Sequence, residues 1–153
     1  MNVLGVLTSG PTAFRGEGIN HENEPFVGEL TVQPLEGGSA ALLKYIATLQ
    51  NGEVAHSEST LLGVGPDGNL CLWPVMSELP VVLPHVEKIS HLEPGTFTEA
   101  VFASGNRDDP SSFREEITVR VNSDGSLLYA HAWGLPGGSF EERSSCSMVP
   151  SVA

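Results

Sequence analysis

Basic residues are scarce in this chain of 153 residues, with 7 Lys and Arg against 19 Asp and Glu and a net charge of −12. Proteins bind nucleic acid mainly by neutralising its phosphates with Lys and Arg, and anionic membrane surfaces attract basic segments. We therefore expect neither nucleic acid nor a membrane as a partner. The chain also lacks a run of the roughly 20 apolar residues that a membrane helix requires, and its first residues lack the basic region of a signal peptide.

Cysteine is nearly absent, and the two present, Cys71 and Cys146, lie far apart and form no Cys-x-x-Cys pair. Such lone cysteines are typical of buried apolar positions in a reducing compartment. Together with the missing signal they predict a cytoplasmic protein. Long helices are also excluded, because 17 Gly and 11 Pro are distributed along the chain.

Glycine-containing turn dipeptides divide the chain into short segments rich in Val, Leu, Ile, Thr and aromatic residues. Glycine permits the positive φ angles of tight hairpins, and segments of this composition between such turns are typical of strands. The dipeptides are Gly37-Gly38, Asn51-Gly52, Asp67-Gly68, Pro94-Gly95, Asp124-Gly125 and Gly137-Gly138. The predicted strands are 13–19, 26–34, 41–49, 53–64, 69–76, 81–91, 97–103, 112–122, 126–134 and 140–148. Residues 1–12 are expected to be an irregular or helical N-terminal segment of a single domain.

Alternation of side chains predicts how these strands are arranged. In 112–122, Phe113 and Ile117 share one face, whereas Arg114 and Glu116 share the other. A meander of about ten such antiparallel strands has two exposed edges, and closure into a barrel removes them. We therefore predict an all-β fold, a single antiparallel up-and-down barrel, wide enough to hold a small ligand in an internal cavity.

Two strands alternate apolar residues with titratable ones on a single face. His56 and Glu58 share a face of 53–64, and Tyr129, His131 and Trp133 share a face of 126–134. Such a mixture suits the wall of a wet cavity, although an outward, solvated face would have the same pattern. The cavity interpretation predicts that these five residues line one end of it.

The sequence offers few signatures of chemistry. Its five histidines include no His/Cys cluster with zinc-like spacing. His85 and His91, if on one strand face, would be roughly 20 Å apart. We therefore expect no metal site. A Gly-x-Ser-x-Gly elbow and a complete dinucleotide-binding loop are also missing. The one candidate for catalysis is His56 with Glu58 as an acid–base pair.

Five segments of the chain carry recognisable motifs. These segments are Phe14 to Gly18, Ala41 to Thr48, Glu53 to Gly68, Phe113 to Glu115 and Gly125 to Tyr129. The first has an aromatic-x-Gly-x-Gly pattern in which glycines let strands approach closely, and the third combines a His-x-Glu-Ser strand with a Pro-Asp-Gly turn. Together the segments resemble nitrobindin and the nitrobindin-like, fatty-acid-binding-protein-like barrels of the calycin (lipocalin-like) group.

The resemblance implies a ten-stranded antiparallel barrel around an apolar pocket that holds haem, with an axial histidine on the last strand. His56 matches the family's His-x-Glu histidine, and Met76 falls at a pocket-lining position. The last predicted strand has no histidine here, and it offers only Cys146 and Met148 as other iron ligands. We therefore predict no haem cofactor of the family type, with His131 as the one residue that could replace the missing ligand.

The sequence therefore favours a non-catalytic carrier or sensor that holds a small apolar or amphipathic ligand inside the barrel. The ligand-binding residues expected are His56, Glu58, Met76, Tyr129, His131 and Trp133. Three alternatives stay open: a haem protein ligated by His131, a small enzyme using the His56–Glu58 pair, and a filled barrel with a purely structural or interaction role. A homodimer is compatible with the sequence as well.

Overall fold

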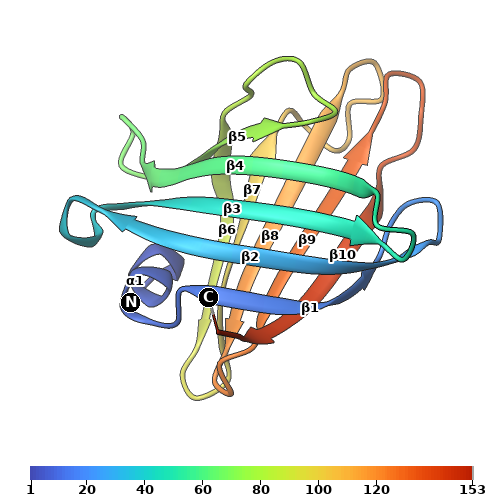
Figure 1. Ribbon diagram of the computed structural model, residues 1–153. Helices are drawn as coiled ribbons and strands as arrows, with labels where there is room; N and C mark the ends of the chain where they lie inside the picture. The colour runs from blue at the N-terminus through green and yellow to red at the C-terminus, as the bar shows by residue number, and fades with distance from the viewer. Residues whose placement is uncertain (153) are drawn as a thin grey trace.

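Ten antiparallel strands close into one barrel in the computed structural model, which describes residues 1–152 with the exception of the side chains of 89–92. The strands are β1 (Ala13–Ile19), β2 (Pro25–Leu35), β3 (Ala40–Leu49), β4 (Val54–Val64), β5 (Leu70–Met76), β6 (His85–Glu93), β7 (Phe97–Ser104), β8 (Arg114–Asn122), β9 (Leu127–Gly134) and β10 (Glu141–Pro150). Each pairs with the next along the chain, and β1 pairs with β10 to complete the ring (Figure 1). The predicted all-β barrel is confirmed.

The strand boundaries agree closely with those expected from the turn dipeptides, with one exception. The segment predicted over 81–91 begins only at His85, after Val81 and Val82, which are about half exposed. Pro84 precedes the strand, and proline cannot donate a ladder hydrogen bond. The expectation that His91 shares a face with His85 concerns a side chain outside the described part of the structure.

The N-terminal segment 1–12, expected to be irregular or helical, contains one helix, α1 (Val3–Ser9). The Asn2 side chain accepts a hydrogen bond from the Gly5 amide and caps the first turn. Val3, Leu4 and Leu7 are buried, and the helix packs against β2, β3, β7 and β8. In the part of the chain that the structure describes, no helix has the length and hydrophobicity needed to cross a lipid bilayer.

The barrel interior is built by the alternation that the sequence shows. On β8 and β9, Ile117, Val119, Leu127 and Tyr129 are fully buried or nearly so. Both cysteines are free and buried, as expected. Apolar side chains from nearly every strand form one core, which comprises Val3, Leu4, Leu7, Phe14, Phe26, Leu30, Val32, Ala41, Leu43, Tyr45, Ala47, Leu62, Leu70, Leu72, Met76, Ala100, Phe102, Ile117, Val119, Leu127, Tyr129, Cys146 and Met148.

Glycine is required where β1 closes against β10. A Cβ on Gly16 would lie 1.9 Å from the carbonyl oxygen of Ser147, far inside van der Waals contact. Only a residue without a side chain allows this approach of the two backbones.

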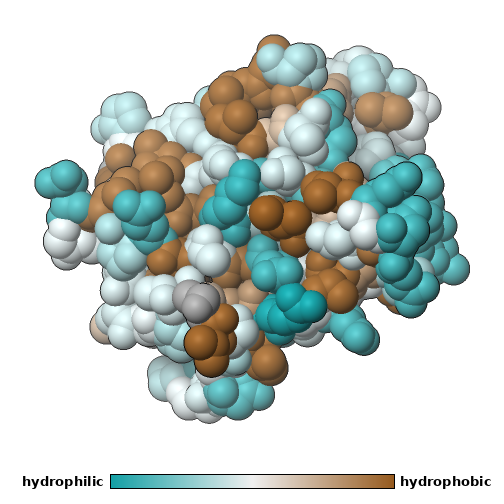
Figure 2. Space-filling view, viewed as in Figure 1, coloured by the Kyte–Doolittle hydropathy of each residue, from teal (hydrophilic) through white to brown (hydrophobic). Residues whose placement is uncertain are grey.

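The outer surface carries apolar residues in separate groups among polar ones, as Figure 2 shows for one face. On β3 and β4, Leu42 and Leu61 are direct cross-strand neighbours, and both are partly exposed. Such scattered apolar residues are normal on a globular surface.

Candidate functional site

A pocket with a volume of about 330 Å³ opens at one end of the barrel. Phe113, which directly precedes β8, and Glu115 near the start of β8 help to line it, whereas Val6 of α1 lies near Val121 at the end of the same strand. The pocket and the helix therefore occupy opposite ends. Its lining residues are Asn20, His21, Ala55, His56, Met76, Glu78, Leu79, Phe113, Glu115, His131, Trp133, Leu135, Arg143 and Ser144. An apolar and aromatic surface with a few polar groups is typical of small-molecule sites.

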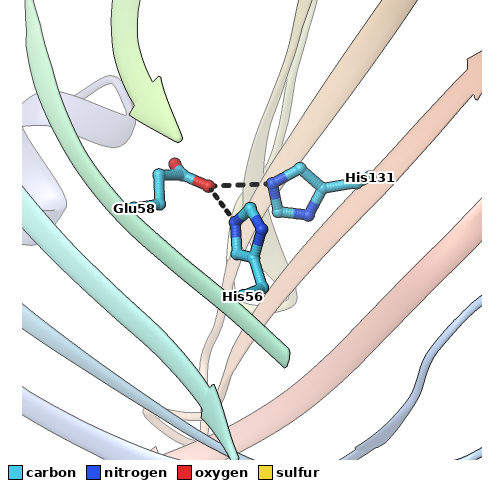
Figure 3. A group of neighbouring side chains, drawn as sticks. All are labelled: His56, Glu58 and His131. Carbon is cyan, nitrogen blue, oxygen red and sulfur yellow. Dashed lines mark hydrogen bonds and ion pairs between the residues drawn. The ribbon is translucent and has the colours of Figure 1, made fainter. Parts of the chain in front are cut away.

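A buried carboxylate, Glu58 of β4, lies beneath this pocket, in contact with the lining residues His56 and His131, and is only 1% exposed. Its Oε1 accepts hydrogen bonds from His56 Nε2 at 2.9 Å and His131 Nε2 at 3.0 Å (Figure 3). Its Oε2 accepts hydrogen bonds from the hydroxyls of Thr60 and Tyr129. Both carboxylate oxygens are thus fully engaged, as a buried charge requires.

The residues of this group come from opposite walls of the barrel. β4 and β9 are five strands apart in a ring of ten, so their inward side chains meet across the interior. His56 and Glu58 are two residues apart on β4, and Tyr129 and His131 are two residues apart on β9. Since side chains of a strand alternate between its faces, each pair points to the same side. The ring centroids of His56 and His131 are 5.3 Å apart.

Burial and hydrogen bonds together determine the protonation states of Glu58 and His56. Burial alone would raise the pKa of Glu58, but the hydrogen bonds from His131 and His56 outweigh it and hold the pKa well below its usual range. Burial likewise opposes the charged form of His56, but hydrogen bonds to Glu58 and Glu78 raise its pKa to about 9. Its Nδ1 lies 2.8 Å from Glu78 Oε2. At neutral pH His56 is therefore an imidazolium between two carboxylates.

The wall of the pocket contains a second cation, Arg143 of β10. Its guanidinium carbon lies 4.7 Å from the centre of the Trp133 ring, and its Nε donates to the Trp133 carbonyl. The His21 ring also packs edge-on against Trp133, and the centroids of the two rings are 5.5 Å apart. Trp133 thus contacts two neighbouring side chains, which restrict the position of its ring in the pocket wall.

The structure places the six predicted site residues in two layers. His56, Met76, His131 and Trp133 line the pocket. Glu58 and Tyr129 lie beneath it, fully buried, and support the two histidines rather than facing the open volume. Their role in binding stays a prediction.

Several lining residues were not anticipated, and the reasons differ. Glu78 lies in the connection between β5 and β6, where strand periodicity gives no information. Arg143 lies at an irregularity of β10, where the register shifts between Glu142 and Ser144 and the alternation of faces is interrupted. Glu115, in contrast, has the same parity as Phe113 and Ile117, so alternation within 112–122 carried the signal that could have found it.

Haem, which the resemblance implies, requires a protein ligand for its iron that is directed into the pocket. On β10 the two side chains able to bind iron, Cys146 and Met148, are fully buried and do not line the pocket. At the pocket floor His56 and His131 direct Nε2 at Glu58 rather than at the open volume. These residues do not fit haem held in the family manner.

Comparison with known proteins shows the fold. No protein-family model matches the chain, and no curated protein does. Among solved structures, the crystal structure of Rv2717c from M. tuberculosis is similar over 97% of both chains, with a TM-score of 0.77 and 14% sequence identity. At this identity the likeness concerns architecture alone. The chain thus has the same barrel fold as Rv2717c.

Proposed function

We propose that the protein is a non-catalytic carrier or sensor that binds a small, partly apolar molecule in the end pocket. The observation that carries the proposal is the pocket itself. Its volume of about 330 Å³ lies at the lower end of the range of small-molecule sites. It combines an apolar wall, including Met76, Phe113 and Trp133, with a polar floor of His56 and His131.

One polar atom of this floor is available to a ligand. His131 donates from Nε2 to Glu58, and its Nδ1 has no hydrogen-bond partner among the described residues. Since a neutral imidazole with a proton on Nε2 has a lone pair on Nδ1, that atom can accept a hydrogen bond from a ligand donor. An amphipathic molecule with a donor at one end and an apolar body would match both parts of the pocket.

The geometry supports binding better than acid–base catalysis by His56 and Glu58. A general base works best when its pKa is near the operating pH. His56 holds its proton up to about pH 9, and the Glu58 carboxylate is buried below the pocket with all of its hydrogen bonds satisfied. Neither group of the pair is poised to take a proton from a substrate.

The test combines native mass spectrometry of freshly purified protein with titration of an apolar naphthalene dye followed by tryptophan fluorescence. The two tryptophans provide a matched pair, because Trp133 lines the pocket and Trp73 of β5 does not. We expect saturable one-to-one dye binding that changes Trp133 emission. The emission change should persist in Trp73→Phe and disappear in Trp133→Phe.

A co-purifying mass that the dye displaces would support the proposal further. Absence of saturable binding, or a response that survives in Trp133→Phe and vanishes in Trp73→Phe, would refute it.

A further inference from the structure

We propose that His56, Glu58 and His131 form a three-ligand site for a zinc-like divalent transition-metal ion, with an open coordination position bordering the end pocket. The proposal is independent of the proposed function. The spacing of histidines along the chain predicted no metal site. His131 joins His56 and Glu58 only in the folded barrel, because it comes from the opposite wall.

The three ligand atoms already converge on one point (Figure 3). Nε2 of His56, Oε1 of Glu58 and Nε2 of His131 all lie within 4.8 Å of one another. The carboxylate oxygen is 2.9 Å and 3.0 Å from the two nitrogens. Ligand atoms about 2.0–2.2 Å from a tetrahedral zinc ion are roughly 3.3–3.6 Å apart. To admit an ion, the carboxylate oxygen must therefore move a few tenths of an ångström from each nitrogen, and each Nε2 must release the proton that it donates to Glu58.

Residues outside the group orient two of the ligands, His56 and Glu58. This is the second observation that points to a metal. Glu78 binds Nδ1 of His56 at 2.8 Å, so the opposite nitrogen, Nε2, points to the centre of the group. Tyr129 and Thr60 donate to Oε2 of Glu58, which leaves Oε1 directed to the same centre. Metal-binding histidines are characteristically oriented by such a carboxylate on the second ring nitrogen, and ligating carboxylates are hydrogen-bonded in turn.

The donor set and the charge identify the class of ion. Two imidazoles and one carboxylate suit zinc and neighbouring transition metals, whereas calcium and magnesium prefer oxygen ligands alone. The carboxylates of Glu58, Glu78 and Glu115 lie in or under the pocket, and the chain carries a net charge of −12, both of which favour a cation. Three protein ligands leave one position for water or for a small molecule with a donor atom.

The experiment is titration of the metal-free full-length protein with Co²⁺, whose visible absorption reports coordination, followed by displacement with Zn²⁺. We expect one Co²⁺ per chain and stoichiometric displacement. His131→Gln and His56→Gln should abolish the absorption band. Glu78→Ala should weaken Co²⁺ affinity by roughly 10–100-fold, the usual effect of removing a group that orients a metal ligand.

A control variant separates this site from adventitious binding. Glu17→Ala removes an exposed carboxylate on β1 that does not line the pocket. It should bind Co²⁺ as the unmodified protein does. Glu78 is about half exposed, so Glu78→Ala is expected to fold even where a change at a buried histidine does not.

The proposal is overturned if the unmodified protein shows no saturable Co²⁺ absorption, or if folded Glu78→Ala binds Co²⁺ as tightly as Glu17→Ala. Dye binding measured with a chelator present reports the pocket alone. A failure of metal binding and a failure of the proposed ligand binding are therefore distinguishable.

Discussion

Replacement of Glu58 by Gln tests whether the buried carboxylate organises the pocket floor. The substitution keeps the shape of the side chain but removes the charge. An amide has only one oxygen, so it cannot accept from His56 and His131 on one side and from Tyr129 and Thr60 on the other. Two of the donors must turn away or lose a charged partner.

The expected loss is large because the group is only 1% exposed and solvent cannot replace the missing acceptor. Removing one partner of a buried ionic network typically costs about 3–5 kcal/mol in the free energy of unfolding. For a chain of this length that corresponds to a decrease in Tm of roughly 6–20 °C. Since small domains are stable by about 5–15 kcal/mol, Glu58→Gln should fold but with a much reduced margin.

Urea unfolding followed by far-UV circular dichroism measures the effect, with the slope of the transition compared to confirm that both forms unfold in one step. The control is Glu29→Gln, which breaks an exposed 2.8 Å ion pair with Arg15. An exposed pair contributes about 0–1 kcal/mol. If Glu58→Gln is no more destabilising than Glu29→Gln, the reasoning about this group is wrong.

Three further predictions concern single groups. His56 holds its proton more tightly when folded, with a pKa of about 9 against about 6.5 unfolded. Its contribution to the free energy of unfolding should therefore be complete below pH 6.5 and should fall by up to about 3 kcal/mol as the pH rises from 6.5 through 9, measured by urea unfolding across that range. Tyr129→Phe removes a hydrogen bond to the Glu58 carboxylate and should lower the free energy of unfolding by about 1.5–3 kcal/mol, measured by thermal or urea unfolding. Tyr45→Phe should cost less than about 1 kcal/mol, because the Tyr45 hydroxyl has no hydrogen-bond partner among the described residues. Equal losses in the two variants would contradict this prediction. Gly16→Ala should lower the free energy of unfolding by more than about 3 kcal/mol or prevent folding, because its Cβ would lie 1.9 Å from a backbone oxygen. Gly63→Ala should change the free energy of unfolding by no more than about 1 kcal/mol in the same measurement, because the nearest atom to its Cβ would be 3.6 Å away.

The strand order could be predicted because the signals are local. Turn dipeptides such as Asn51-Gly52 and Asp124-Gly125 lie in hairpins where the glycine has φ of 89° and 88°, a conformation that glycine adopts without strain. Where the connection is long, as between β5 and β6, composition misled the prediction. Val81 and Val82 have the composition of a strand but lie in the connection.

The site could be predicted only in part, for a geometric reason. Alternation along one strand identified His56 with Glu58 and, separately, Tyr129 with His131. Closure of the ring, which was also predicted, places β4 and β9 on opposite walls. Alternation gives no distance across the interior, however, so the hydrogen bonds of both histidines to Glu58 could not be predicted. The role of Glu78 depends on a connection whose path no periodicity describes.

The closure of β1 onto β10 also has a consequence for folding kinetics. Every other strand pairing joins neighbours in the chain, whereas this one pairs Phe14 with Pro150. Closing a loop of this length costs roughly 3 kcal/mol more in chain entropy than closing a five-residue hairpin loop. A meander of hairpins can therefore form early, with the seam between the first and last strands joining late. A circular permutant that links the two ends through a short connection and opens a hairpin elsewhere would make this seam local, and the late, non-local pairing would move to the two strands of the opened hairpin while the barrel stays the same.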